Sequence, residues 1–411
     1  MITVTLNPSL DRTLDTAGFA LGEVNRAVRS HLDAGGKGIN VSRGLHRHGL
    51  PTVAVFPVGG PDGQVLVSEL AAQGVPVHPV PIAGAIRSNV TIADASGVTT
   101  KINAPGPTIS PEELDAMAAA VTDELDRGAA AVVAAGSLPS SVPSGFLARL
   151  GAIAREHGAR FAVAAGGLSV VKPNDEELAE LVGRELVTVG DVRSAAAEVL
   201  DAGNAAVLVS LGAHGALLVV PDGTWWAGGD PLVAVSTVGA GDSTLAGWLA
   251  TDGADPADRL RTAVAWGRAA VQLPGTEMPG PSDLDLASVR VVEPLIPARL
   301  VALDLAAADR DAATRTLIDL LVAAGRVTDA DGFHADVRAR EAQMATGMPG
   351  GIGLPHARSE HVTVPSLAVG RVPAGVDFGA PDGPATLVFL IAAPTGGDAD
   401  HLKILAALAR R

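Results

Sequence analysis

One short stretch of the 411-residue sequence combines glycines with an aspartate at the start of an apolar helix. It runs S-T-V-G-A-G-D-S from Ser236 and contains Gly239, Ala240, Gly241 and Asp242. A Gly-Ala-Gly turn that opens a helix lets backbone N–H groups point at one spot, where the helix dipole also favours negative charge. The aspartate can then accept the proton of an attacking hydroxyl while the amides hold a transferring phosphoryl group. The alternative is an aspartate that only caps the helix.

Two stretches near the N-terminus offer groups that could hold the acceptor of such a phosphoryl group. The sequence A-G-G-K-G-I-N-V places Gly35, Gly36 and Lys37 before a predicted helix, with Asn40 in its first turn. The glycines allow ligand hydroxyls to approach closely, and Lys37 provides a point charge for a phosphate. Asp11 follows the first predicted strand, where ligands of open α/β sheets bind.

Two later stretches could serve a nucleotide and its metal. In K-P-N-D-E-E-L, Asn174 and Glu177 are three residues apart, a spacing that can orient a hydrated Mg²⁺. In S-L-G-A-H-G-A, a predicted strand ends with glycines. This predicts a nucleotide-binding surface formed by Ser210, Gly212 and Gly215.

The elements that must position these residues follow an alternating pattern from residue 1 to about 290. Short β-branched runs (53–58, 130–134, 206–210 and 216–220) alternate with Ala/Leu-rich segments (114–125, 192–202 and 259–273). This alternation predicts an α/β fold with a mostly parallel sheet and helices on both faces. Residues 11–34 and 87–103 are strand-like with few helix signals, so they predict a small separate sheet that covers the site as a lid.

A second α/β pattern follows a Pro-rich stretch. It consists of a strand near 299–303, helices near 310–324 and 332–346, strands near 366–372 and 386–391, and an apolar helix from His401. The predicted domains are therefore residues 1–293 and 299–411, joined by a linker at 294–298.

Composition narrows the class of protein. The net charge of −15 argues against nucleic acid or an anionic membrane as the main partner. The absence of cysteine excludes disulfides, thiolate catalysis and Cys-ligated metals. The N-terminus lacks a basic-then-apolar leader, and no stretch approaches the ~18 apolar residues of a membrane span. We therefore expect a soluble cytoplasmic protein that is not membrane-embedded.

The order of motifs in residues 1 to about 293 resembles the PfkB, or ribokinase-like, family of carbohydrate kinases. The motifs are N-P-x-x-D, G-G-K-G-I-N, K-I-N-x-P-G from Lys101, G-S-L-P from Gly136, K-P-N-x-x-E-L, S-L-G-x-x-G-A and S-T-V-G-A-G-D-S. They look most like the hexose-phosphate branch, which includes 1-phosphofructokinases and tagatose-6-phosphate kinases.

This resemblance implies ATP and Mg²⁺ as cosubstrates, Asp242 as the general base and Gly239–Gly241 as the anion hole. The residues it implies at the sugar phosphate are Asp11, Gly35, Gly36, Lys37, Asn40, Arg87, Asn89 and Lys101. Those it implies at the nucleotide are Lys172, Asn174, Ser210, Gly212, Gly215 and Thr237, with Asn174 and Glu177 at the metal. The family's small sheet also implies a homodimer formed through the lid.

One segment departs from the family pattern. Between strand-like residues 161–164 and 170–172 only Ala165–Ser169 intervene, whereas a parallel crossover ordinarily needs about a dozen residues or more. The family's D-x-S/T-x-x-A-L is replaced by A-A-G-G-L from Ala164, so an aspartate and most of a helix are missing. Either the crossover is rebuilt, with the 161–164 strand lost or shifted, or the core is damaged.

Residues from about 295 to 411 resemble the fructose/mannitol enzyme IIA family of the sugar phosphotransferase system. The motifs are R-E-A-Q-M-A-T-G from Arg340, G-G-I-G-L-P-H-A-R around His356, V-D-F-G-A-P-D-G, L-V-F-L-I-A-A-P and D-H-L around His401. The resemblance implies phosphorylation of His356, with His401 beside it and Arg340 as a nearby cation. Imidazole is a good nucleophile near neutral pH and a reversible phosphoryl carrier.

The family pattern also implies partners. A histidine-containing phosphocarrier protein would be the donor, and a separate IIB/IIC fructose permease the acceptor, because the chain has no cysteine to act as a IIB site. The family continues past A-A-L-A-R with a further strand and helix, so a C-terminally truncated domain is expected.

The leading hypothesis is therefore a bifunctional enzyme that converts ATP and fructose 1-phosphate to ADP and fructose 1,6-bisphosphate and also relays phosphoryl groups through His356. Two alternatives stay open. One is a tagatose-6-phosphate kinase, and the other is a catalytically impaired kinase fold that acts as a phosphohistidine-bearing regulatory or relic protein.

Overall fold

The computed structural model describes residues 1–95, 99–163, 170–292 and 298–395. The chain divides into two compact units, Met1–Pro221 with Trp225–Val292, and Asp222–Thr224 with Glu293–Arg411. The division at Val292 lies next to the linker that the sequence predicts. Most of that linker, the crossover at 165–169 and the helix expected from His401 lie outside the described residues.

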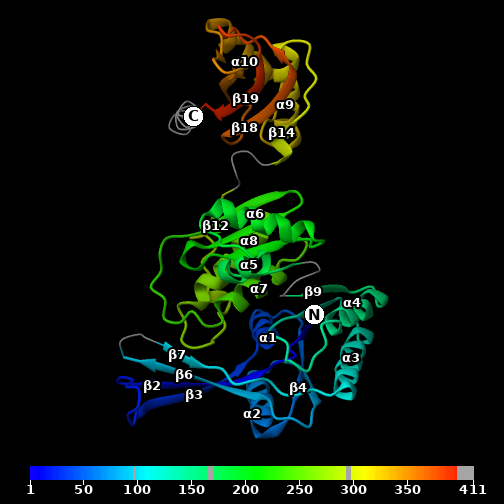
Figure 1. Ribbon diagram of the computed structural model, residues 1–411, viewed down its shortest axis with the longest axis vertical. Coiled ribbons are helices and arrows are strands. Elements are labelled where there is room, and N and C mark those ends of the chain that lie inside the picture. Colours follow the sequence, from blue (N-terminus) through cyan, green and yellow to red (C-terminus); the bar gives the residue numbers. More distant parts are fainter. Residues whose placement is uncertain (96–98, 164–169, 293–297, 396–411) are drawn as a thin grey trace. The chain divides into compact units, whose positions relative to one another are not determined.

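A parallel sheet forms the first half of the first unit (Figure 1). Its strand order is β5-β4-β1-β8-β9, and every pair is parallel. The strands are β1 (Ile2–Val4), β4 (Val53–Val58), β5 (Val77–Pro81), β8 (Ala131–Ala134) and β9 (Arg160–Val163). The sheet, with helices on both faces, confirms the predicted α/β class.

Successive side chains of β4 pack on opposite faces of the parallel sheet, against different helices. Val55 packs in the core formed with α3 (Pro111–Asp126) and α4 (Phe146–Glu156), whereas Ala54 and Phe56 pack with α2 (Gly60–Ala72). Successive strand side chains point to opposite faces, so an apolar run of this kind needs helices on both sides. Helix α1 (Lys37–Arg47) lies on the same face as α2.

A second sheet follows with the order β10-β11-β12-β13, in which β10–β11 and β12–β13 are antiparallel. Its strands are β10 (Val207–Ser210), β11 (Ala216–Val220), β12 (Gly223–Gly228) and β13 (Arg290–Val292). The neighbouring helices are α5 (Asp175–Val182), α6 (Val189–Asp201), α7 (Ala240–Ala250) and α8 (Pro256–Ala270). The sequence pattern predicts β10 and β11 but gives no strand for β12 and β13.

The residues on the two sides of the shortened crossover pair with different sheets. The strand expected at 161–164 is neither lost nor displaced from the sheet, because β9 pairs with β8 from Arg160 to Val163. On the other side, Val171 and Asn174 form parallel bridges to Val207 and Ser210 of the second sheet. Among the described residues, β9 and the Val171 bridge belong to different sheets. Residues 164–169, which connect them, lie outside the described residues.

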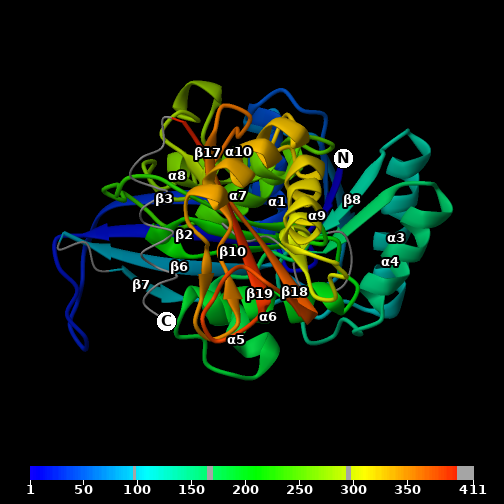
Figure 2. The same cartoon turned by 90° about the horizontal axis from the view of Figure 1, so that it is seen from above.

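The lid predicted from residues 11–34 and 87–103 is a separate four-stranded sheet with the order β3-β2-β6-β7. Its strands are β2 (Ser9–Thr16), β3 (Ala27–Gly35), β6 (Arg87–Asp94) and β7 (Thr99–Ile102). Figure 2 shows these strands together on the side of the unit opposite to α3 and α4. The central strands β2 and β6 are parallel, which places Asp11 beside Asn89.

In its described residues, the second unit contains a mixed sheet with the helices α9 (Arg310–Ala323) and α10 (Ala330–Gln343). Its order is β14-β18-β19-β16-β15, and β17 also pairs with β19. The strands are β14 (Val301–Ala302), β15 (Gly347–Met348), β16 (Ile352–Gly353), β17 (His356–Ser359), β18 (Ser366–Val376) and β19 (Ala385–Pro394). Leu317, Phe333 and Leu390 are fully buried in the core between helices and sheet.

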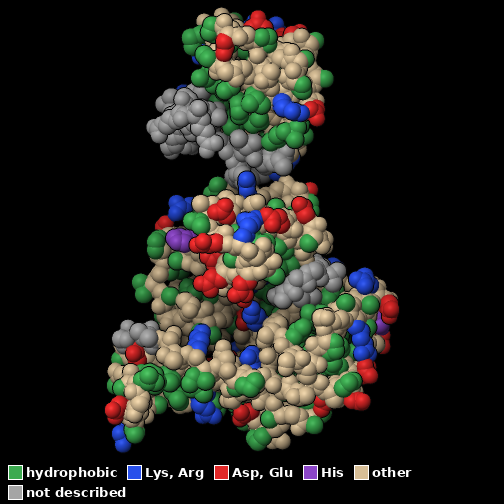
Figure 3. All heavy atoms as spheres, viewed as in Figure 1, with side chains coloured by type: hydrophobic (Ala, Val, Ile, Leu, Met, Phe, Trp, Pro, Cys, Tyr) green, Lys and Arg blue, Asp and Glu red, His purple; other side chains and the backbone are tan. Residues whose placement is uncertain are grey.

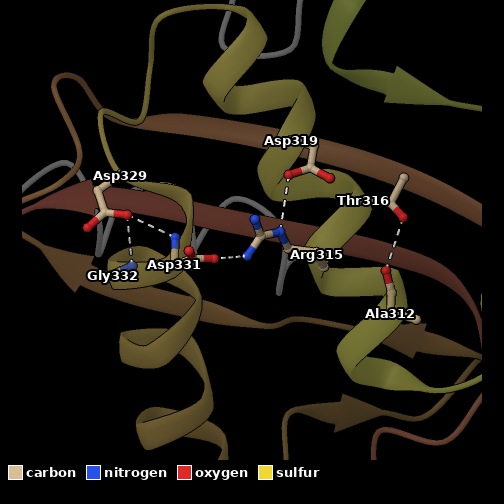
Figure 4. A network of polar contacts seen from close by, with 7 residues as sticks. All are labelled: Ala312, Arg315, Thr316, Asp319, Asp329, Asp331 and Gly332. Atoms are coloured by element: carbon tan, nitrogen blue, oxygen red, sulfur yellow. Dashed lines mark hydrogen bonds and ion pairs between the residues drawn. The ribbon is translucent and has the colours of Figure 1, made fainter.

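Polar contacts join α9 to α10 (Figure 4). Arg315 of α9 pairs with Asp331 at the start of α10, and its Nε lies 3.2 Å from Asp319 Oδ1. These carboxylates raise the pKa of Arg315. Asp329 caps α10 by accepting hydrogen bonds from the N–H groups of Asp331 and Gly332 at 3.0 and 3.2 Å. None of the helices in the described part of the chain is long and apolar enough to cross a bilayer.

Close packing of α7 against α8 gives a test of the fold. A Cβ at Gly247 would lie 2.8 Å from Trp266 Cγ and 3.0 Å from Ala263 Cα, so Gly247→Ala should destabilise the first unit by about 1–3 kcal/mol despite the better helix propensity of alanine. Denaturant unfolding followed by tryptophan fluorescence measures this, because all four tryptophans belong to the first unit.

Gly145→Ala is the matched control, since a Cβ there meets nothing within 4 Å and its φ is −73°. Because Gly145 is the N-cap of α4, we expect only a change in unfolding free energy smaller than that of Gly247→Ala. Equal stabilities of the two variants would contradict the close approach of α7 and α8.

Candidate active sites

The turn before α7 has the backbone that the sequence predicts for an anion site. Gly239 is the N-cap of α7 with φ 80° and ψ −9°, a left-handed conformation that favours glycine. Its carbonyl accepts the first helical hydrogen bond from Ser243 N at 2.9 Å. Asp242 therefore lies in the first turn, beside the N–H groups at the positive end of the helix dipole.

The carboxylate of Asp242 is held by α1, a helix distant in sequence. Asn40 Nδ2 donates a hydrogen bond to Asp242 Oδ2 at 2.9 Å. Burial raises the pKa of Asp242, and the negative charge of Asp11 adds to this effect, whereas the Asn40 hydrogen bond, Lys37 and Lys172 oppose it. An aspartate with a raised pKa is a stronger proton acceptor than an exposed one.

Two lysines bring positive charge to the same region. Lys172 Nζ lies 3.2 Å from the position that a Cβ of Gly241 would occupy, and it donates to Ser210 Oγ at 3.5 Å. Burial lowers the pKa of Lys172, while the charge of Asp242 raises it. Lys37 begins α1, and its Nζ lies 3.6 Å from Glu177 Oε1. This arrangement suits the transfer of an anionic phosphoryl group to a hydroxyl beside Asp242.

Asn174 and Glu177, the predicted metal residues, form a capping box at the start of α5. Asn174 Oδ1 accepts from Glu177 N at 2.6 Å, and Glu177 Oε2 accepts from Asn174 N at 3.0 Å. Burial alone would raise the pKa of Glu177, but the Asn174 hydrogen bond and the two lysines lower it. Within the described residues there is no group of three or more His, Cys, Asp or Glu side chains arranged for a metal. One ionised carboxylate fits Mg²⁺ that is held mainly by water and nucleotide phosphates.

A cavity of about 490 Å³ opens beside these groups; its polar lining includes Asn7, Lys37, Arg87, Ser137, Lys172 and Glu177. Figure 3 shows Lys and Arg side chains inside the hollow of the first unit and acidic side chains along its rim. Asn7 Oδ1 and Arg87 Nε are buried without a hydrogen-bond partner. Burial lowers the pKa of Arg87, and Asp11 opposes that shift. Unsatisfied buried groups beside a cavity fit a site for a polar, anionic ligand.

The lid contributes a second polar cluster. Asp11 Oδ1 accepts a hydrogen bond from Asn89 Nδ2 at 2.8 Å across the β2–β6 pair. A Cβ at Gly35 would lie 2.3 Å from Asp11 Oδ2, so only glycine fits next to this carboxylate. The structure thus brings Asp11, Gly35 and Asn89 together on adjacent strands.

Of the predicted residues, Lys37, Arg87, Lys172 and Glu177 line the cavity, whereas Asp242, Asp11 and Asn40 are not among its lining residues. Lys101 is exposed on β7, and Thr237 is exposed before α7. Gly212 and Gly215 are not among the residues that line the cavity. A Cβ at Gly215 would meet Ala227 O at 2.0 Å, which gives this glycine a packing role.

Sequence reasoning missed three polar residues of the first site. Asn7 donates to Ser137 Oγ at 3.0 Å, and both line the cavity. Arg43 donates to Asn40 Oδ1 at 3.1 Å. Asn7 and Ser137 lie in motifs already noted, and Arg43 lies two residues after one, so proximity to these motifs is the signal that could have found them.

In the second unit, His356 begins β17 and is partly buried. Its Nδ1 lies 2.9 Å from Leu354 O, which makes Nδ1–H the donor and leaves the ring lone pair on Nε2. Arg340 lies in the last turn of α10, the helix that packs on β17. His401 lies outside the described residues.

A helix N-terminus with a partly buried carboxylate and two lysines, built on a mostly parallel α/β fold with a β lid, defines the class of sugar kinases that the sequence motifs resemble. The chain belongs to the pfkB family of carbohydrate kinases, which it matches over residues 4–283. Residues 294–411 match the EIIA 2 family of the phosphoenolpyruvate-dependent sugar phosphotransferase system. Sugar kinases of the pfkB family use ATP.

Similar proteins agree with this assignment. The chain is 36% identical over 302 residues to 1-phosphofructokinase of Rhodobacter capsulatus, which covers 69% of this chain and 93% of that protein. It is 36% identical over 291 residues to ATP-dependent 6-phosphofructokinase isozyme 2 of Escherichia coli, covering 67% and 94%. The crystal structure of phosphofructokinase-2 from Escherichia coli in complex with potassium superposes with a TM-score of 0.64 at 35% identity, covering 69% of this chain and 96% of that one.

The environment of Asp242 predicts a dependence of stability on pH. Its pKa is raised above the ordinary 3.8, so ionisation destabilises the folded state as pH rises from about 3.8 through the folded pKa. Asp242→Asn cannot ionise there, and we expect this variant to be more stable than wild type at neutral pH, with the difference shrinking to nothing below pH 3.8.

Unfolding free energies from tryptophan fluorescence between pH 3.5 and pH 8 would measure this difference. Asp123→Asn, which changes an exposed aspartate on α3, is the control and should show no such trend. A wild-type protein as stable as Asp242→Asn at neutral pH would show that the carboxylate is not destabilised by burial.

Proposed function

We propose that the first unit transfers the γ-phosphoryl group of ATP to fructose 1-phosphate and forms ADP and fructose 1,6-bisphosphate. The observation that carries this proposal is the carboxylate of Asp242, fixed by Asn40 at the N-terminus of α7 and close to Lys37 and Lys172. Several similar proteins are named 1-phosphofructokinases, and a fused EIIA 2 unit favours a sugar phosphate produced by fructose uptake.

In this mechanism Asp242 accepts the proton of the sugar's 6-hydroxyl as its oxygen bonds to the γ-phosphorus. The bond between that phosphorus and the bridging oxygen of the β-phosphate breaks, and ADP leaves. The N–H groups of Gly239–Gly241 and the Lys172 ammonium stabilise the charge on the transferring group. Lys37, Arg87 and Asp11 with Asn89 hold the sugar phosphate. Mg²⁺, when bound near Glu177, neutralises phosphate charge.

The cavity's polar lining supports a substrate that already carries a phosphate. Lys37 and Arg87 both face it, and the buried Nε of Arg87 lacks a partner that an anion would supply. Fructose 6-phosphate and tagatose 6-phosphate are the alternative acceptors, because 6-phosphofructokinase isozyme 2 of Escherichia coli is as similar in sequence.

We also propose that the lid pairs two copies of the chain. Leu21, Val24 and Val28 on β3 and the β2–β3 connection are 94, 80 and 73% exposed, and Ile102 of β7 is 59% exposed. Exposed apolar side chains on the lid strands and on the loop that joins two of them fit an interface between identical lids.

For the second unit we propose phosphorylation of His356 Nε2 by a histidine-containing phosphocarrier protein, followed by transfer to a separate IIB/IIC fructose permease. The hydrogen bond from Nδ1 to Leu354 O fixes the tautomer that this chemistry needs. Arg340 would be the nearby cation and His401 the second histidine. The alternative is a catalytically impaired kinase fold that acts as a phosphohistidine-bearing regulatory or relic protein. It is motivated by the A-A-G-G-L segment and predicts no sugar-phosphate turnover.

Asp242→Asn should lower kcat for fructose 1-phosphate by at least about 10²-fold because the general base is lost, while calorimetry should still detect ATP and sugar-phosphate binding. Asp123→Asn should keep wild-type kcat.

Lys37→Ala and Arg87→Ala should raise KM for the sugar phosphate far more than KM for ATP. Equal use of unphosphorylated fructose would refute the sugar-phosphate specificity, and near-normal turnover of Asp242→Asn would remove this residue from its role.

His356→Ala should abolish acid-labile phosphorylation by the phosphocarrier protein in the presence of phosphoenolpyruvate and enzyme I, whereas ATP should not substitute as donor. The kinase activity should be unchanged, because His356 lies in the other unit. His361→Ala is the matched control in the same unit and should still be labelled. Labelling of the His356→Ala variant, or of wild type at another histidine, would refute the assignment.

A further inference from the structure

Arg43 is a buried arginine on α1, only 7% exposed, and three residues after Asn40. Its Nη1 donates hydrogen bonds to Asn40 Oδ1 at 3.1 Å, to Ala34 O at 3.1 Å and to Thr276 O at 3.3 Å. Its Nε donates to Gln73 Oε1 at 2.8 Å. One guanidinium thus joins the end of lid strand β3, the helix α1, the C-cap of α2 and the loop that follows α8.

The direction of these bonds decides how Asn40 is oriented. An arginine side chain has only donors, so the atom of Asn40 that faces Arg43 must be the carbonyl oxygen. The amide nitrogen of Asn40 then has to face Asp242, as the 2.9 Å contact with Oδ2 requires. Without Arg43, rotation of the amide by half a turn would bring its oxygen against the carboxylate.

We propose that Arg43 is a positioning residue for phosphoryl transfer, which acts by locking the Asn40 amide so that its nitrogen holds the carboxylate of Asp242 in place. The proposal rests on the role given above to Asp242 as the proton acceptor. Arg43 acts through Asn40, because it makes no hydrogen bond of its own to Asp242 within the described residues.

The charges around Arg43 support a fixed guanidinium at this position. Burial lowers the pKa of Arg43, and the carboxylates of Asp33, Asp11 and Glu277 oppose this shift. These groups keep a cation here even though the side chain is almost inaccessible.

A second cavity, of about 640 Å³, has Arg43 in its lining. Its lining includes Asp33, Arg43, His46, Arg47, Gln73 and Glu277. Because the cavity is polar and open to solvent, a small cation can reach the space that an Arg43→Ala variant would leave. This makes rescue by added guanidinium a direct test of the proposal.

The first measurement compares kinetics of wild type, Arg43→Ala, Asn40→Ala and the double variant on the full chain with fructose 1-phosphate. We expect Arg43→Ala to lower kcat by about 10- to 100-fold, the range for a hydrogen bond to a charged group, with little change in KM for ATP. In the Asn40→Ala background the same substitution should lower kcat by less than about 2-fold, because both act through one amide.

The pH profile separates this role from a loss of stability. The Asn40 hydrogen bond lowers the pKa of Asp242, so its loss should move the acid limb of kcat to higher pH in Arg43→Ala and Asn40→Ala alike. The other charged groups around Asp242, namely Lys37, Lys172 and Asp11, are unchanged in both variants. Guanidinium at a non-denaturing concentration should restore kcat and the acid limb of Arg43→Ala but not of Asn40→Ala.

Arg47→Ala is the control, since Arg47 is on the same helix and lines the same cavity. It should keep wild-type kcat and show no response to guanidinium. If Arg43→Ala does not fold, Arg43→Lys retains a donor and the charge, and it should keep the wild-type acid limb with a smaller loss of kcat. An acid limb displaced as far in Arg43→Lys as in Asn40→Ala would overturn the proposal.

The outcomes distinguish this proposal from the function on which it rests. Absence of turnover by wild type, or normal turnover by Asp242→Asn, would defeat the proposed function. If wild type is active and Asp242→Asn is not, wild-type kcat in Arg43→Ala or full additivity with Asn40→Ala would overturn the role of Arg43 alone.

Discussion

The partly buried carboxylate of Asp242 needs hydrogen-bond donors and positive charges close to it, and much of the first unit is arranged to supply them. Removing a carboxylate from water is unfavourable unless hydrogen bonds and opposite charges stay within a few ångströms. Here the partners come from two separate segments, with Asn40 and Lys37 on α1 and Lys172 before α5. The packing of α1 against α7 is therefore a condition for the site, and Val41, Leu45, Leu245 and Ala246 of those helices share one buried core.

Several polar groups of this unit stabilise local structure and face the site at once. Glu177 completes the capping box of α5 through Oε2 and presents Oε1 to Lys37. Asp11 holds Asn89 across two lid strands, so the carboxylate expected at the sugar is also a cross-strand contact. Such double use restricts the rotamers of these side chains before any ligand arrives, which lowers the entropic cost of binding.

The second unit fixes its histidine by a different means. His356 is held by the carbonyl of Leu354 and by strand pairing of β17 with β19, so backbone atoms orient the ring. The helices α9 and α10 of this unit are joined by the ion pair of Arg315 with Asp331. A ring oriented by a backbone carbonyl suits a histidine on a surface that other proteins must reach.

Local pattern determined most of the elements. The strands at 53–58 and 216–220 were predicted with the bounds that β4 and β11 have, and α9 was predicted at 310–324 against Arg310–Ala323. The turn at Gly239 and the loop before His356 were also evident from residue type. These features depend on side-chain periodicity and on backbone conformations that only a few residue types favour, and both are written in neighbouring residues.

Tertiary structure alone decided which of these residues meet. Asn40 and Asp242 are 202 positions apart, and no local signal shows that their side chains bond or that Arg43 orients the amide between them. The pair Asn174 and Glu177 looked like metal ligands by spacing, and the structure adds that they cap a helix. Lys101 belongs to a specific motif yet lies exposed on an edge strand. Contacts over such separations depend on how helices and sheets pack. The same holds for the assignment of β9 and the Val171 bridge to two different sheets, which the local sequence between them does not indicate.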